Sequence, residues 1–431
     1  MKLLVVGSGG REHAIIRKLR QNPEVSEIFA LPGNGGIALD AVCVPIAAND
    51  VEGVVKFAVR EKIDFAVVAP EDPLCLGMVD ALEAKGIPAF GPDKRAAEIE
   101  GSKVFAKNLM KAYGIPTARY EVFDEAAEAL QYVGGLTRFP VVIKADGLAM
   151  GKGVLICNSR EECFAAVRGI MEHRVFGENG RRLVIEEFLT GPEISVLAFT
   201  DGETLVPMVS AMDHKRALDG DKGLNTGGMG AVAPNPFYPE DIAARCREEI
   251  FLPTIRAMKA EGRTFRGCLY FGLMLTGEGP KVIEYNCRFG DPEAQVVLAL
   301  LNSDLLAVFK ATRDGTLKDT PVEFSCGSAC CVVLASGGYP EAYKTGYPIG
   351  GLTNGQVSDA EVYHAGVKVS CEGALLTAGG RVLGVTASAP TLAEAVKKAY
   401  GAADGIRFER MYRREEIGRR ALLASSKKEG T

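Results

Sequence analysis

The first 100 residues alternate short apolar runs with stretches of helical periodicity. The apolar runs cover residues 3–6, 27–31 and 65–68, and the helical patterns begin near Arg11, Val51 and Leu76. This alternation is typical of a parallel sheet whose strands are joined by helices that pack on both faces. It predicts a doubly wound α/β domain over residues 1–100.

The loops after these predicted strands are candidates for a ligand site, because ligands of such sheets bind at the carboxyl ends of the strands. The loops cover residues 7–13, 32–36 and 70–74. The first resembles a dinucleotide-binding turn, but Glu12 stands where that motif needs its last glycine. The second strand ends in Leu31 and Pro32, without the acid that holds a ribose hydroxyl. An NAD-dependent oxidoreductase is therefore the weaker interpretation, although the helix start at Arg11 can still receive one phosphate.

A glycine-rich segment at residues 144–154 follows a buried strand predicted at 141–143. Glycines there allow backbone N–H groups to fold over phosphates, and Lys144 supplies a positive charge. The segment is not a Walker motif, because only three residues separate Gly147 from Gly151, and Gly153 stands in the metal-binding Ser or Thr position. A flexible hairpin is the alternative. Further on, a hinge-like segment at residues 186–191 offers backbone groups for an adenine edge.

The stretch from Val282 to Gln295 carries the clearest chemistry. On a strand, alternate residues share a face, so Glu284 and Asn286 point the same way and Arg288 continues the row. Carboxylate and amide oxygens suit a hard cation such as Mg2+. The partner strand at 267–275 offers no carboxylate, so phosphate and water must complete the metal shell. Asp291 is predicted as the N-cap, and Pro292 as the first residue, of a helix reaching about residue 301.

The remaining segments are less regular. Residues 213–230 are polar and lack strand or helix periodicity, which predicts a long functional loop, with disorder as the alternative. A helix is expected over about 241–260. Residues 326–431 carry short predicted strands and Gly-rich turns, which indicates a small β-rich domain with little chemistry of its own.

Bulk composition limits the classes of function. At 431 residues the chain is expected to form about three domains. We predict boundaries at 1–100, 101–325 and 326–431, with a lid lobe at about 120–190. A net charge of −5 argues against nucleic acid or an anionic membrane as partner. The eleven scattered cysteines and the lack of a long apolar run predict reduced thiols, no membrane span and a cytoplasmic location.

Together these motifs resemble the phosphoribosylamine-glycine ligase (glycinamide ribonucleotide synthetase) family of the ATP-grasp superfamily. The most specific part of the resemblance is the run from Arg288 to Gln295. The sequence departs from the family pattern at Ala69, Leu224 and Glu416. The resemblance covers nearly the whole chain, at residues 7–14, 32–34, 70–74, 101–103, 141–154, 186–195, 213–216, 225–230, 267–274 and 284–295.

The resemblance implies a two-lobed ATP-grasp domain and an ATP-dependent ligase of purine synthesis. ATP would phosphorylate glycine, and 5-phosphoribosylamine would displace phosphate from glycyl phosphate to form the amide. Mg2+ or Mn2+ would bind Glu284 and Asn286. Arg288 and Asp291 would orient glycine and, with Lys144, act in catalysis.

Two sets of binding residues follow from the same reasoning. The expected ATP-binding residues are Lys103, Lys144, Gly151, Lys152, Gly153, Glu186, Glu187, Phe188, Leu189 and Glu193. By resemblance, the residues that would hold the sugar phosphate are Gly9, Gly10, Arg11, Glu12, Asn34, Glu71, Asp213, Lys215, Arg216, Asn225, Thr226, Gly227, Gly228 and Met229.

Two other functions remain open at this point. One is a nucleotide-binding module without catalysis, and the other is an ATP-grasp ligase that joins a different acid or amine. The sequence leaves the oligomeric state open, and a monomer is compatible with it.

Overall fold

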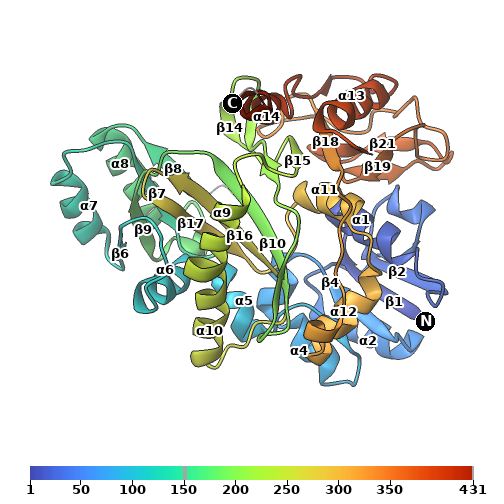
Figure 1. Cartoon of the computed structure of the whole chain (residues 1–431), viewed down its shortest axis with the longest axis horizontal. Coiled ribbons are helices and arrows are strands. Elements are labelled where there is room, and N and C mark those ends of the chain that lie inside the picture. Colours follow the sequence, from blue (N-terminus) through green and yellow to red (C-terminus); the bar gives the residue numbers. More distant parts are fainter. Residues whose placement is uncertain (149–152, 430–431) are drawn as a thin grey trace.

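The computed structural model describes residues 1–148 and 153–429, with side chains up to Ser426 (Figure 1). Residues 1–101 form a parallel sheet in the order β3-β2-β1-β4-β5. Its strands are β1 (Lys2–Gly7), β2 (Glu27–Pro32), β3 (Val42–Cys43), β4 (Phe65–Val68) and β5 (Ala89–Phe90). Its helices are α1 (Gly10–Leu19), α2 (Val51–Glu61), α3 (Glu71–Leu76), α4 (Met78–Glu83) and α5 (Lys94–Gly101), with a 3-10 turn at Ile37–Leu39.

This strand order reverses between β1 and β4, so the loops after these two strands open at one point of the sheet. The loop expected at residues 70–74 is instead mostly helix α3, which begins at Glu71. Pro73 is tolerated there because the first turn of a helix needs no N–H donor at that position. The expected doubly wound fold is confirmed, and Glu71 lies at the start of a helix.

The region predicted as the lid lobe contains the antiparallel sheet β6-β9-β7-β8, which lies at the left in Figure 1. Its strands are β6 (Tyr120–Phe123), β7 (Val141–Ala145), β8 (Val154–Cys157) and β9 (Leu183–Glu187). The helices here are α6 (Lys103–Ala112), α7 (Ala126–Gly134) and α8 (Arg160–Val167), followed by a π turn at Arg168–Glu172 and a 3-10 turn at Gly177–Gly180.

A second antiparallel sheet, β11-β10-β16-β17, faces the lid lobe. It comprises β10 (Glu193–Thr200), β11 (Leu205–Pro207), β16 (Gly267–Thr276) and β17 (Gly279–Asn286). The helix expected over 241–260 is a run of α9 (Glu240–Cys246), a π turn (Arg247–Phe251) and α10 (Leu252–Ala260). The ribbon predicted from 267–275 and 281–286 is confirmed, with Glu284 opposite Gly272 and Asn286 opposite Tyr270.

The prediction of an irregular loop over residues 213–230 is wrong. It contains the hairpin β13 (Arg216–Leu218) and β14 (Lys222–Asn225), flanked by β12 (Met212–Asp213) and β15 (Gly230–Ala233). The hairpin strands are short and polar, so they show none of the apolar alternation from which strands are recognised. The flanking strands are fixed by pairing with distant segments rather than by a local pattern. Strand β12 pairs with β15, and β15 pairs with β18 (Ser328–Ser336).

The C-terminal region shares this sheet, whose order is β12-β15-β18-β22-β19, with β23 also beside β18. The remaining strands are β19 (Glu361–His364), β20 (Val367–Val369), β21 (Leu375–Thr377), β22 (Arg381–Ala389) and β23 (Met411–Tyr412). The helices of residues 293–429 are α11 (Glu293–Leu300), α12 (Leu305–Asp314), α13 (Leu392–Ala403) and α14 (Arg419–Glu429), with a 3-10 turn at Leu317–Asp319. Helix α13 begins with a capping box formed by Thr391 and Glu394.

Four phenylalanines fix the stretch that follows β17. Phe289 packs against Phe199 and Phe309 with ring centroids 5.9 and 6.2 Å apart, and Phe309 stacks on Phe90 at 3.8 Å. These rings come from the first sheet, the second sheet and α12, so the backbone around Arg288 is held by three parts of the molecule. None of the described helices is long and apolar enough to cross a membrane.

Candidate functional site

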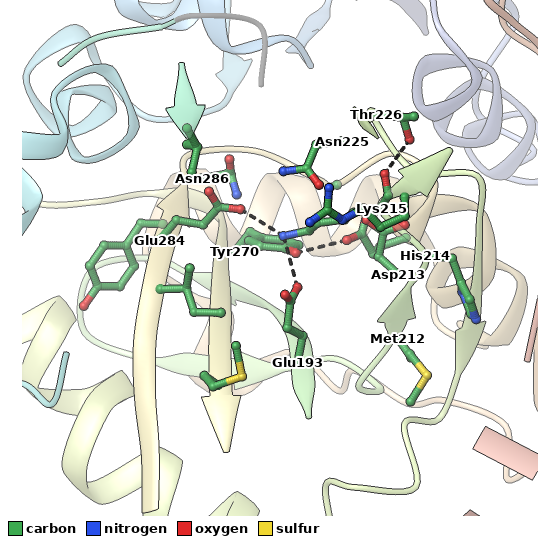
Figure 2. Close-up of a pocket in the computed structure, with 18 of the residues that line it drawn as sticks. Glu193, Met212, Asp213, His214, Lys215, Asn225, Thr226, Tyr270, Glu284 and Asn286 are labelled. Carbon is green, nitrogen blue, oxygen red and sulfur yellow. Dashed lines mark hydrogen bonds and ion pairs between the residues drawn. The ribbon is translucent and has the colours of Figure 1, made fainter. Parts of the chain in front are cut away.

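A cavity of about 1250 Å³ lies where the lid lobe, the second sheet, the first sheet and the C-terminal region meet. Figure 2 shows the polar side chains that project into it from β17, β10 and the segment after β12. From the end of β17 onward the exposure alternates, because Tyr285 and Cys287 are buried while Glu284, Asn286 and Arg288 are partly open. The predicted polar row on this strand is therefore present, and it faces the cavity.

Glu284 and Asn286 present two oxygen donors next to two cationic side chains. The Lys215 ammonium lies 3.4 Å from Glu284 Oε1, and Arg288 Nη2 donates to Asn286 Oδ1 at 3.3 Å. Lys215 lowers the pKa of Glu284 to about 2, more strongly than burial raises it. The carboxylate is thus ionised at neutral pH, and the donor pair fits a hard divalent cation. Among the described residues no group of three or more His, Cys, Asp or Glu side chains could hold a metal.

Lys215 bridges two carboxylates across the cavity floor, as Figure 2 shows. Its ammonium lies 3.5 Å from Glu193 and 3.4 Å from Glu284. Burial alone would lower the pKa of Lys215, but Glu284 and Glu193 outweigh burial and hold that pKa well above its usual range. Lys215 is therefore a permanent positive charge between the two acids.

Glu186 is clamped between two buried lysines on the lid side. Its Oε2 atom lies 3.0 Å from Lys107 Nζ, and its Oε1 atom lies 3.0 Å from Lys144 Nζ. The contact with Lys144 is an ion pair without hydrogen-bond alignment, since Glu186 Oε1 accepts no hydrogen bond. Lys144 instead donates to the Ile283 carbonyl at 3.0 Å, and Lys103 donates to Gly147 at 2.7 Å. Three lysines thus lie on this side of the cavity, two of them at Glu186 and one at Gly147.

Arg288 is held by two acids from the N-terminal region. Its Nε donates to Glu71 at 3.0 Å and its Nη2 to Glu100 at 2.8 Å. Burial opposes the charge, but Glu100 and Glu71 keep the pKa of Arg288 well above its usual range. Arg11 reaches the same place, donating to Glu12 at 2.7 Å and to the Phe289 carbonyl at 3.0 Å. These contacts attach the first βα loop to the 288–291 segment.

Asp291 does not cap helix α11, which begins one residue later than expected, with Pro292 at the N-cap. Its carboxylate accepts from Gln295 Nε2 at 2.8 Å and lies 3.3 Å from Arg381 Nη2. The N-cap prediction is therefore wrong, because the carboxylate faces the side chains of Gln295 and Arg381 rather than a backbone N–H of the first helical turn. Arg381 belongs to β22, so the C-terminal region, of which little chemistry was expected, contributes a charged side chain to the cavity.

Comparison with known proteins identifies the family. Models of the phosphoribosylglycinamide synthetase family match its N domain at residues 1–100, its ATP-grasp (A) domain at 101–294 and its C domain at 329–420. The phosphoribosylamine–glycine ligase of Caldanaerobacter subterraneus subsp. tengcongensis is 48% identical over 97% of this chain and 99% of that relative. The chain belongs to the phosphoribosylglycinamide synthetase family. The fold and family expected from the motifs are confirmed.

Solved structures support the family assignment. The crystal structure of the phosphoribosylamine–glycine ligase from Thermotoga maritima is 36% identical, with a TM-score of 0.84 over 97% of this chain and all of that one. A biotin carboxylase from Campylobacter jejuni shares the fold alone, at 13% identity and a TM-score of 0.75 over 96% of this chain and 92% of that one. As a family member, the chain is an ATP-dependent ligase that joins glycine and phosphoribosylamine in purine biosynthesis and uses a divalent metal.

Most residues expected to bind substrates in this synthetase line the cavity, but six do not. Glu12 accepts from the Gly9 N–H at 2.6 Å and so closes its own loop. The Asn34 amide donates to Ser8 and to His364 at 2.8 Å, which ties the first sheet to the C-terminal region. The other residues that do not line the cavity are Gly9, Gly10, Gly228 and the fully buried Met229. Gly151 and Lys152 lie outside the described residues.

Several cavity residues of the synthetase were missed by the sequence reasoning. Lys107 lies four residues after Lys103 on α6, so helical periodicity was an available signal. Glu100 was visible as an acid on the buried side of α5. No motif in the sequence around Arg381 indicates a place in the cavity, because that place depends on where β22 meets the other segments. The missed cavity-lining residues include Glu100, Lys107, Tyr270, Glu293 and Arg381.

Proposed function

We propose that this cavity carries out the ligase reaction in two steps. The glycine carboxylate first takes the γ-phosphoryl group of ATP, which gives glycyl phosphate and ADP. The amine of 5-phosphoribosylamine then attacks the carbonyl carbon, and phosphate leaves as the amide forms. The observation that carries the proposal is the ionised Glu284 beside Asn286, facing three lysines across one cavity.

ATP would lie between the lid sheet and the second sheet. Lys103 and Lys144 would neutralise its phosphates, together with the glycines and Lys152 of the 151–153 segment. The backbone of Phe188 and Leu189 would bind the adenine edge, and Glu193 the ribose hydroxyls. Glu186 would keep Lys144 extended, since the two charges lie 3.0 Å apart. Arg119 Nε donates to the Glu187 carboxylate at 2.9 Å, so we expect this carboxylate to stabilise the fold rather than to contact ATP.

The divalent ion would be Mg2+ or Mn2+, held by Glu284 and Asn286. When bound, such an ion neutralises phosphate charge during phosphoryl transfer. Lys215 shares Glu284 and would keep the same carboxylate oriented toward the phosphates.

Arg288 and Asp291 would orient glycine. Arg288 makes bonds to both Glu71 and Glu100, so gripping a carboxylate requires one of these acids to give way. Glu71 is the more exposed of the two, with 26% of its side chain accessible, and it is the partner we expect to exchange. Phosphoribosylamine would be bound by Arg11, Glu71, Lys215, Arg216, Asn225, Thr226 and Gly227.

The lid lobe at about 120–190 would close over ATP and protect glycyl phosphate from water. We propose the domains 1–100, 101–325 and 326–431. With these limits, β15 of the second domain pairs with β18 of the third. We also propose a cytoplasmic location, since all eleven cysteines are free thiols.

The test is ADP release with each component omitted in turn. We expect ADP formation to require ATP, glycine and the divalent ion, and full turnover to require phosphoribosylamine as well. Faster turnover with another amino acid in place of glycine would contradict the assignment.

A further inference from the structure

The hairpin of β13 and β14 carries cavity residues but has almost no core of its own. Arg216 begins β13 and Asn225 ends β14, and both line the cavity. All four residues of β14 are exposed, and Ala217 is the buried residue of β13. A two-stranded hairpin is at best marginally stable by itself in water. The positions of Arg216 and Asn225 therefore depend on contacts outside the hairpin.

A short segment near the C-terminus supplies such contacts. Residues 412–416 precede α14, and Figure 1 shows β14 next to this helix. The Tyr412 hydroxyl donates to the Ala217 carbonyl at 2.7 Å. The Gly220 N–H, in the turn of the hairpin, donates to the Glu416 carboxylate at 2.5 Å. The C-terminal segment thus holds both strand β13 and the turn that follows it.

Arg414 adds charged contacts to this pairing. Its side chain is only 1% exposed. Its Nη1 atom donates to the Arg216 carbonyl at 3.1 Å, and its Nη2 atom donates to Asp221 at 3.0 Å and to Glu416 at 2.6 Å. One planar guanidinium therefore joins the start of the hairpin, its turn and the C-terminal segment. Hydrogen bonds between charged groups are stronger than neutral ones, and several from one rigid group also fix geometry.

The groups that are open to the cavity belong to the hairpin rather than to Arg414. Both terminal amino groups of Arg414 already donate to protein atoms, and its side chain is almost fully buried. Asn225 is exposed and Thr226 is partly open, and Figure 2 shows both beside Lys215. Any effect of Arg414 on a bound substrate must therefore pass through the hairpin.

We propose that Arg414 is a positioning residue for the phosphoribosyl substrate, which acts by holding the hairpin of β13 and β14 against the C-terminal segment. Binding costs less free energy when the contacting groups are already ordered. Without the guanidinium, Arg216 and Asn225 would have to be ordered at each binding event. The proposed ATP site lies between the lid sheet and the second sheet, so it does not depend on the hairpin. This inference rests on the proposed function, in which Arg216, Asn225 and Thr226 bind phosphoribosylamine.

The experiment measures the binding of the product glycinamide ribonucleotide, which retains the phosphoribosyl group, to the full chain by titration calorimetry. We expect Arg414→Met to raise the Kd of this product roughly tenfold or more, because charged hydrogen bonds to the hairpin are lost. The Kd of a non-hydrolysable ATP analogue with Mg2+ should change less than twofold. Arg414→Lys should give an intermediate product Kd, since an ammonium group lacks the planar fork that reaches three acceptors.

Arg413→Met is the matched control. The Arg413 guanidinium is also paired with acids, but it donates to Asp404 and Glu415 rather than to the hairpin. The product Kd and the Kd of the ATP analogue should both stay within twofold of those of the unmodified chain.

An unchanged product Kd in Arg414→Met would overturn the proposal, and so would equal weakening of the product and the ATP analogue. A variant that only loses folded protein would bind less product per chain at an unchanged Kd, so the stoichiometry separates misfolding from lost positioning. If Arg414→Met does not fold, Tyr412→Phe removes a single hydroxyl from the same contact. It should raise the product Kd roughly twofold to fivefold, and no rise would contradict the proposal. Absence of product binding by the unmodified chain would instead refute the proposed function, and this inference with it.

Discussion

Arg381 donates to the backbone carbonyl of Asp291 at 2.7 Å while its other amino group lies 3.3 Å from the Asp291 carboxylate. The same guanidinium donates to the Gly227 carbonyl at 2.7 Å. One side chain from the C-terminal sheet therefore joins two segments that enclose the candidate glycine site. The C-terminal region thus contributes at least this side chain to the lining of the cavity.

We expect Arg381→Met to lower kcat/KM for glycine at least tenfold, because both segments lose a charged donor. Hydrogen bonds to charged groups contribute about 1.5–3 kcal/mol each, which corresponds to roughly tenfold or more in rate. The KM for ATP should stay within twofold. Steady-state kinetics measure both constants, with Arg407→Met, an exposed arginine of the same region, as the control. Equal losses for ATP and glycine would contradict this role.

Glu284→Gln keeps the shape of the side chain but removes its charge. Turnover should fall at least tenfold, or about 1.4 kcal/mol, because the metal and Lys215 lose their shared carboxylate. ADP release at saturating substrates measures the effect. Glu278→Gln, in the exposed turn of the same ribbon, is the control. Full activity in Glu284→Gln would exclude the metal assignment.

Lys144→Met should weaken ATP binding by roughly tenfold to a hundredfold, since a charged contact contributes about 1.5–3 kcal/mol. The binding of glycine should change much less. Equilibrium binding of a fluorescent ATP analogue and of labelled glycine separates the two effects. The exposed Lys111→Met is the control on the neighbouring helix α6. Comparable losses for both ligands would argue against a phosphate contact.

Gly228→Ala should abolish most activity without unfolding the chain. Gly228 has a φ of +109°, and an added Cβ would meet both Pro292 and Asp213 at under 3 Å. Residues other than glycine rarely adopt this backbone conformation, and the added Cβ must displace Pro292 or Asp213. We expect glycine binding to fall more than ATP binding. Gly86→Ala, at another positive φ but with nothing within 4 Å, tests the strain by itself.

Stability at acidic pH should depend on His214. Its Nδ1 faces the Gly230 carbonyl at 3.2 Å and its Nε2 accepts from the Gly418 N–H, so the neutral ring suits the site. Burial, with help from Arg414, lowers the pKa of His214 to about 4. The unfolded chain, with an ordinary pKa near 6.5, then binds more protons than the folded chain between these values.

His214 therefore contributes about 3 kcal/mol to the free energy of unfolding above pH 6.5. This contribution is lost as the pH falls toward 4. Urea unfolding at pH 7 and pH 5 measures it. The loss should be smaller in His214→Gln than in the unmodified chain. An equal loss in both would show that other groups, such as His364, account for the acid sensitivity.

The sequence alone determined features that repeat along a short stretch of chain. Alternation of exposure put Glu284 and Asn286 on one face of a strand, and the pattern of apolar runs gave the parallel sheet. Lys144 was identified because it ends a buried strand beside glycines. These features depend on backbone periodicity, which is visible in a few neighbouring residues.

The tertiary structure decided which distant side chains share one cavity. Arg381 reaches Asp291 from 90 residues away, and Glu100 reaches Arg288 from 188 residues away. The hairpin at 216–225 was missed for the same reason, because its short polar strands have no local period. Folding also decided the pKa values of Asp213, Glu284 and His214, because burial raises the first and lowers the third, while Lys215 lowers the second.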